Sequence, residues 1–137
     1  MTSAGTHSLS LSPPEIEALA RMAEAVLAEL PEPIRSAIDH VVFRVEDWPD
    51  ALRLRRMGIG SPYGLLGLYE GVPQGQRSIH DHARLPDVIR LYRMPILAFA
   101  QDQDLPVEAV VRHVLIHEIG HHFGLSDAQM AAIENTP

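Results

Sequence analysis

The sequence predicts an α+β fold, in which a small mixed β-sheet packs with an N-terminal helix and a buried helix near the C-terminus. Three patterns support this prediction. Apolar residues recur at helical spacing over residues 16–30. Apolar and β-branched runs of strand length occur at residues 38–45, 65–70 and 88–92. In the helix expected at residues 104–123, residues 107–123 are apolar almost all round, which is typical of a buried helix.

Length and composition fit one domain with one core. The chain has 137 residues, of which 46% are hydrophobic. We expect a disordered tail at residues 1–12, followed by a single domain at residues 13–137. Cysteine is absent, which excludes disulfides and thiolate metal sites. Imidazole and carboxylate are therefore the strong metal ligands that the chain offers.

Charge and hydropathy limit the classes of partner that we expect the chain to bind. The formal net charge is −7, and all of the 11 basic residues are arginine. An acidic chain has no general attraction for phosphate backbones, so no nucleic-acid partner is expected. The first residues lack the basic start and apolar run of a secretory signal, and no run of about 18 apolar residues is present. We expect a soluble, cytoplasmic protein with no membrane partner, while the oligomeric state stays open.

The first half of the chain is expected to contain one long helix and one strand. Residues 12–15 indicate a capped helix start, and prolines follow the apolar stripe directly. This stripe is expected to cover the sheet. The run Ile38–Val45 predicts the central strand. A short helical or irregular connection is expected over residues 47–57, followed by a loop rich in glycine and proline.

The second half is expected to contain two strands followed by three helices. Residues 65–70 predict an edge strand and residues 71–87 a polar loop, before a third strand at residues 88–92. Helices are expected at residues 95–100, 104–123 and 126–134. Ser126 and Gln129 have the spacing of a capping box at the start of the last helix.

The stretch His117-Glu118-Ile119-Gly120-His121 has the spacing of a zinc site. At 100° per residue, His121 lies about 40° and Glu118 about 100° from His117, so both imidazoles face one ion and the carboxylate flanks it. Zinc lowers the pKa of a bound water from about 15.7 to about 7, and a neighbouring carboxylate can take its proton and later give it to a leaving amine. Glu118 is therefore the predicted general base.

A catalytic zinc ion usually has three protein ligands. Gly124 can end the helix in the left-handed conformation, and the chain reversal could return Asp127 to the ion as the third ligand. Asp127 also fits the first turn of the last helix, where a carboxylate is favoured, and the two roles are compatible. His80 or His82 in the polar loop is the alternative third ligand.

Three residues near the motif have a structural and a functional interpretation. His113 shares the ligand face but lies about 12 Å along the helix from His121, so it is expected to line the cleft or to support the ligands. His122 points about 140° away from the first ligand, toward solvent or packing. Tyr69 is expected to pack, and its alternative role is a hydrogen bond to the oxyanion.

The stretch from His117 to Asp127 has the form H-E-x-x-H-x-x-G-x-x-D, and the segment L-L-G-L-Y-E-G at residues 65–71 precedes it. In these motifs the chain resembles the minimal zincin-like metallopeptidase family of small bacterial proteins, over roughly residues 15–135. The resemblance implies a reduced zincin-like fold, Zn²⁺ held by His117, His121 and Asp127, and a substrate added as a strand along the sheet edge. Too few residues follow Asp127 for a separate Met-turn, so Met130 is expected to pack a helix.

The predicted function is that of a zinc-dependent metallopeptidase acting on peptides or unfolded protein, with Glu118 as general base. Two alternatives stay open. One is a metal-dependent endoribonuclease, because a bacterial RNA-maturation family has H-x-x-x-H-x-x-G followed by a third histidine; here position 127 is aspartate, and Glu118 stands where that family typically has glycine. The other is a non-catalytic, zinc-stabilised binding module.

Overall fold

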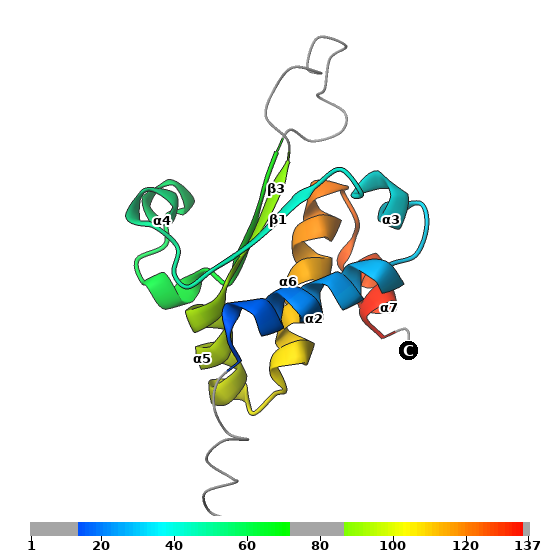
Figure 1. The fold of residues 1–137 in the computed structure, drawn as a ribbon. Helices are drawn as coiled ribbons and strands as arrows, with labels where there is room; N and C mark the ends of the chain where they lie inside the picture. The colour runs from blue at the N-terminus through cyan, green and yellow to red at the C-terminus, as the bar shows by residue number, and fades with distance from the viewer. Residues whose placement is uncertain (1–13, 72–86, 136–137) are drawn as a thin grey trace, which may run out of the picture.

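The computed structural model describes residues 14–71 and 87–135. The described elements are helices that surround a three-stranded sheet of short strands (Figure 1). In chain order they are α2 (Ile16–Glu29), α3 (Ile34–Ala37), β1 (Val42–Glu46), α4 (Ala51–Met57), the 3₁₀ turn η1 (Pro62–Gly64), β2 (Gly67–Glu70), β3 (Val88–Tyr92), α5 (Arg93–Gln103), α6 (Val107–His122) and α7 (Asp127–Glu134). The predicted α+β class with a small mixed sheet is confirmed.

The sheet has the order β1-β3-β2. β1 is parallel to β3, with Val42 opposite Val88, and β2 is antiparallel to β3, with Gly67 opposite Leu91. The prediction that the first strand is central was therefore wrong: β3 is central, and β1 and β2 form the edges. The reason lies in burial, because Leu91 is fully buried in β3 whereas Arg44 is exposed in β1. The edge position predicted for β2 is confirmed.

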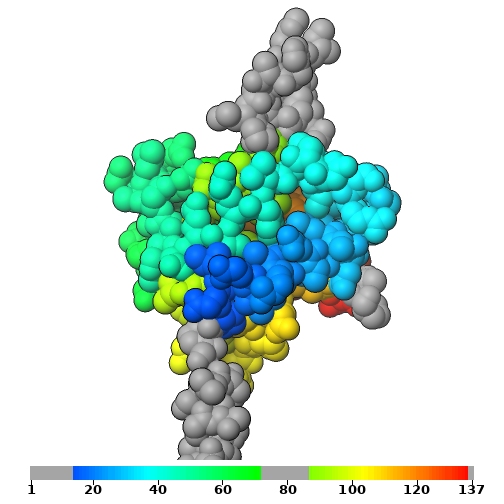
Figure 2. Space-filling view, in the orientation of Figure 1, coloured from blue at the N-terminus to red at the C-terminus, as the bar shows by residue number. Residues whose placement is uncertain are grey.

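The core lies between the sheet and the helices α2 and α6. α2 buries Leu19, Ala23 and Val26 along one face and packs against α6 and β1. The space-filling view shows α2, in blue, lying across this face of the molecule (Figure 2). The apolar stripe predicted over residues 16–30 thus covers α6 as well as the sheet. No helix in the described ranges is long and apolar enough to cross a membrane.

The helices of the second half differ from the predicted ranges at their ends. α5 is longer than predicted and stops at Asp104, whose φ of 55° is left-handed. α6 starts at Val107 because Pro106 takes the N-cap position, where its lack of an N–H costs nothing. α7 begins as predicted, with Ser126 and Gln129 in a complete capping box. The short helix α3 was not predicted from the sequence.

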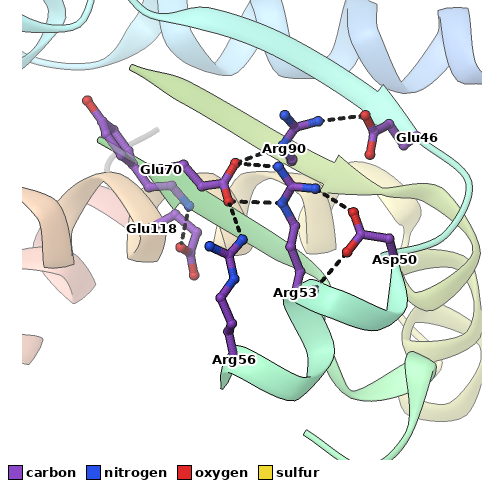
Figure 3. Close-up of polar contacts among 8 residues, drawn as sticks. Glu46, Asp50, Arg53, Arg56, Glu70, Arg90 and Glu118 are labelled. Carbon is purple, nitrogen blue, oxygen red and sulfur yellow. Dashed lines mark hydrogen bonds and ion pairs between the residues drawn. The ribbon is translucent and has the colours of Figure 1, made fainter. Parts of the chain in front are cut away.

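The face of the sheet opposite α2 and α6 carries an ion-pair network (Figure 3). Glu70 of β2 accepts hydrogen bonds from Arg53 of α4 at 2.9 and 3.0 Å and from Arg90 of β3 at 3.0 Å. Arg90 also donates to Glu46 of β1 at 2.7 Å. Since these residues come from all three strands and from α4, the network ties α4 to the sheet.

Candidate metal centre

The C-terminal half of α6 carries the predicted zinc motif. Its N-terminal half is anchored in the core by Val110, Val111 and Leu115, which are all buried. His117 is half-buried and His121 exposed, and their ring centroids lie 6.0 Å apart. A zinc-bound imidazole has its centroid about 3.2 Å from the ion, so two rings that share an ion lie at most about 6.4 Å apart. The separation of the two rings is compatible with one shared ion.

The side chain of Glu118 extends from α6 to the edge strand β2. Its Oε1 accepts a hydrogen bond from the backbone N–H of Tyr69 at 3.0 Å (Figure 3). Burial raises the pKa of the Glu118 carboxyl above its usual value, and the Tyr69 hydrogen bond and the nearby His121 offset this only in part. The side chain is thus a desolvated carboxyl group next to the predicted metal ligands.

The chain reversal predicted after the motif is present. Gly124 has a left-handed φ of 74°, and Leu125 N–H donates to the carbonyl of Gly120 at 2.8 Å. The turn leads directly into the capping box of α7. Asp127 is the first residue of α7 and is exposed. Its place in the first helical turn is therefore confirmed, whereas its role as a ligand stays a prediction.

A different group gathers potential ligand atoms most closely. Within residues 14–71 and 87–135, the one group of three whose ligand atoms all lie within 4.8 Å of one another consists of His113, His117 and Glu134. His121 and Asp127 do not belong to it. Two imidazoles and a carboxylate are a donor set that suits zinc, so the residues gathered at His113, His117 and Glu134 fit a zinc ion.

Glu134 was missed by the sequence analysis. It lies in the last turn of α7, seven residues after Asp127, and neither a motif nor local spacing marks it. Only the packing of α7 against α6 brings it to His117 and His113. This packing is close, because a Cβ added at Gly120 would lie 2.4 Å from the sulfur of the buried Met130. The prediction that Met130 packs a helix is confirmed.

Tyr69 and His122 pack against each other on the far side of the motif. Their rings stack at a centroid distance of 3.9 Å, and the Tyr69 hydroxyl donates to Oδ2 of the buried Asp87 at 3.0 Å. Nε2 of His122 lies 3.8 Å from the same oxygen. The structural interpretation thus holds for both residues, and the Tyr69 hydroxyl is engaged by Asp87. The alternative ligands His80 and His82 lie outside the described residues.

Comparison with known protein families agrees with the arrangement of the motif helix and the edge strand. The family model for zincin-like metallopeptidases matches residues 38–136, which include the whole sheet, α6 and α7. A search of curated proteins found no match. The matched region covers well over half of the chain and contains the motif helix packed beside an edge strand. The chain therefore belongs to the zincin-like metallopeptidase family.

Proposed function

We propose that the protein is a zinc-dependent peptidase, in which His117, His121 and Asp127 hold the ion and Glu118 is the general base. Family membership supports the class of enzyme. The ligand assignment is supported by the spacing of the motif, by the 6.0 Å between the two imidazole centroids and by the reversal at Gly124.

The chain's own contribution to the reaction is the handling of one proton. When bound, zinc supplies the Lewis acidity that polarises the scissile carbonyl and makes water easier to deprotonate. Glu118 accepts a proton from the attacking water at a carboxylate oxygen and returns it to the nitrogen of the leaving amine. The C–N bond breaks as the new C–O bond is retained, so the products are a carboxylic acid and an amine. A carboxyl whose pKa is raised by burial holds this proton more readily than an exposed one.

The observation that carries the proposal is the hydrogen bond between Glu118 and Tyr69 N–H at 3.0 Å. The carbonyl of Leu66 accepts from Tyr92 N–H of β3, so the peptide groups of Leu66 and of alternate residues after it face β3. Those of Gly67 and Tyr69 face the open edge of the sheet. A peptide added as a strand along that edge would therefore run past the carboxylate of Glu118.

Peptides or unfolded proteins are the substrates that this arrangement favours. An extended chain can pair with an edge strand, whereas a folded protein has few strands free to do so. The described domain is small and has few loops to form subsites, so we expect a short cleft of low sequence selectivity. A cytoplasmic location stays a prediction from the sequence.

The test compares the zinc-loaded protein with its Glu118→Gln variant on an unstructured protein substrate. We expect Glu118→Gln to lower the rate of cleavage by about 10²–10⁴-fold, because the general base is lost while the side chain keeps its size. Glu108→Gln is the matched control, since Glu108 is exposed in the first turn of the same helix. It should cleave at the wild-type rate.

RNA as a second substrate separates the alternatives. Cleavage of RNA but not of protein, lost in Glu118→Gln, would replace the peptidase with an endoribonuclease. Zinc binding without cleavage of either substrate by the wild type would indicate a binding module. Zinc content is measured in parallel, so that a lost ion is not mistaken for a lost base.

A further inference from the structure

A second histidine pair precedes the motif pair on α6. His113 lies one turn before His117, and their ring centroids are 4.1 Å apart, closer than the 6.0 Å between His117 and His121. The three histidines thus form two overlapping pairs at the same helical spacing, and His117 belongs to both.

Glu134 of α7 joins the first of these pairs. Its Oε2 lies 2.7 Å from Nδ1 of His113, and its Oε1 lies 3.4 Å from Nε2 of His117. Ligand atoms around a tetrahedral zinc ion are about 3.3–3.6 Å apart. The two contacts run through the two oxygens of one carboxylate. The three side chains offer ligand atoms that all lie within 4.8 Å of one another, so they would have to draw together by no more than about 1.5 Å to hold one ion.

The backbone beneath Glu134 is held by α6. Arg112 donates from Nη2 to the carbonyl oxygens of Ile133 at 3.0 Å and of Glu134 at 3.1 Å, which closes the C-terminal turn of α7 on α6. With Met130 packed against Gly120, α7 is fixed at two points. The carboxylate thus approaches the imidazoles from a supported position, which lowers the entropic cost of binding an ion.

We propose that His113, His117 and Glu134 form a second metal site for zinc and similar divalent transition metals, which competes with the catalytic set for His117. One imidazole nitrogen binds one ion, and Nε2 of His117 faces Glu134. An ion on this site therefore withdraws His117 from His121 and Asp127. The expected consequence, which rests on the proposed function, is that zinc in excess of one equivalent inhibits the peptidase.

Zinc binding in a variant without the catalytic set tests the site. His121→Ala removes one proposed catalytic ligand and leaves His113, His117 and Glu134 in place. We expect this variant to bind Zn²⁺ in competition with a chromophoric chelator, and to give the visible absorption of tetrahedral Co²⁺. Adding Glu134→Gln should weaken binding at least about tenfold, since even groups that only support a ligand contribute about 10–100-fold.

Two further variants in the same background sharpen the test. His113→Ala should weaken binding as Glu134→Gln does, and it changes a side chain that is 51% exposed, so the fold should tolerate it. Glu108→Gln should leave the affinity unchanged. The proposal is overturned if the single variant His121→Ala does not bind zinc. It is also overturned if His121→Ala binds zinc with the same affinity whether or not Glu134→Gln is added. These titrations need no turnover, so they decide the second site even if peptidase activity is absent.

Inhibition by excess zinc is the functional readout. In the wild type, the rate of cleavage should fall as Zn²⁺ rises above one equivalent, and Glu134→Gln should need at least about tenfold more Zn²⁺ for the same inhibition. The inhibition of each protein is expressed relative to its own rate at one equivalent of Zn²⁺. If Glu134→Gln abolishes cleavage at one equivalent, the three residues are the catalytic ligands themselves and the proposal of a separate site is overturned.

Discussion

One partly buried glutamate lies on each side of β2, Glu70 of the strand itself on one side and Glu118 of α6 on the other. The charges around the two side chains differ. On the α4 side, the Glu70 carboxylate meets Arg53 and Arg90. On the α6 side, Glu118 has one backbone N–H as its hydrogen-bond donor among the described residues. The hydrogen bonds from Arg53 hold the pKa of the Glu70 carboxyl below its usual value, whereas burial raises that of Glu118.

The difference separates a residue that stabilises the fold from one suited to chemistry. Glu70 is fixed as a carboxylate and joins α4 to the sheet, so it cannot exchange a proton near neutral pH. Burial raises the pKa of Glu118, which contacts no arginine among the described residues, so this carboxyl group holds a proton more readily than an exposed one. Burial by itself raises the pKa of both carboxyl groups, and the arginines beside Glu70 reverse this effect there. The presence or absence of these arginines therefore distinguishes the two roles.

The largest expected effect comes from disturbing the contact between β2 and α6. In Gly67→Val, the added Cβ would lie 2.6 Å from Cγ1 of Val114 in α6 and 3.2 Å from the backbone oxygen of Arg90. Relief of this overlap should cost about 1–3 kcal/mol of the free energy of unfolding and move Glu118 away from Tyr69. Chemical denaturation measures the first effect, and the rate of peptide cleavage measures the second.

The control for this substitution is Gly60→Val. Apart from its chain neighbours, Gly60 has no heavy atom of a described residue within 4 Å of an added Cβ, and its φ is not left-handed. It should therefore be close to neutral for both stability and cleavage. If Gly67→Val also leaves both unchanged, the close packing of α6 against β2 is not what positions Glu118.

The next effect is a difference between two glutamate-to-glutamine substitutions in how they change the free energy of unfolding. Glu70→Gln should lower the free energy of unfolding by about 1–2 kcal/mol, because Arg53 and Arg90 lose a charged partner. Glu118→Gln should leave stability unchanged or slightly higher, because it removes a buried charge that pairs with no arginine in residues 14–71 and 87–135. Thermal and chemical denaturation of the metal-free variants measure both. Equal losses in the two variants would contradict the contrast between the two sides of β2.

A smaller effect is expected at the turn that leads into α7. Ser126→Ala removes the side chain that accepts from Gln129 N–H at 3.1 Å, so unfolding should become easier by about 1 kcal/mol. Gln129→Ala removes only the reciprocal bond to Ser126 N–H and should cost less. The free energies of unfolding of the two variants give the comparison, and a larger loss in Gln129→Ala would show that the Gln129 side chain, and not the Ser126 hydroxyl, is the main support of this turn.

The sequence was sufficient for those features of the fold that depend on local pattern. The spacing of the H-E-x-x-H motif and the capping box at Ser126 fix which residues share a turn, and the structure has both. The strand β3 was predicted at its observed bounds because its apolar run is short and sharply delimited. The order of the strands was not predicted correctly, because it depends on which strand is covered on both faces.

Contacts between distant segments account for the features that the sequence did not predict. Glu134 reaches His113 only through the packing of α7 on α6, and Asp87 binds the Tyr69 hydroxyl from a position eighteen residues further along the chain. Neither partner is marked by spacing or by residue type. The same holds for Arg53 and Glu70, which are separated by 17 residues and are joined by the approach of α4 to the sheet.

The smallest expected effect is in the response of stability to acid. Because the folded state holds the pKa of Glu70 below the usual 4.5, this group stabilises the fold above that pH, and its contribution is lost as the pH falls through the lower, folded-state pKa. Protonation removes the charge but leaves both oxygens in place, whereas Glu70→Gln replaces one of these acceptors by a donor. The side chain is also 29% exposed, so solvent screens the interaction, and we expect protonation to cost less than the substitution, less than about 1 kcal/mol. Denaturant titrations at neutral and acidic pH should show a smaller acid-induced loss of stability in Glu70→Gln than in the wild type. Identical pH dependence in the two proteins would mean that Glu70 is not held in its charged form by the arginines around it.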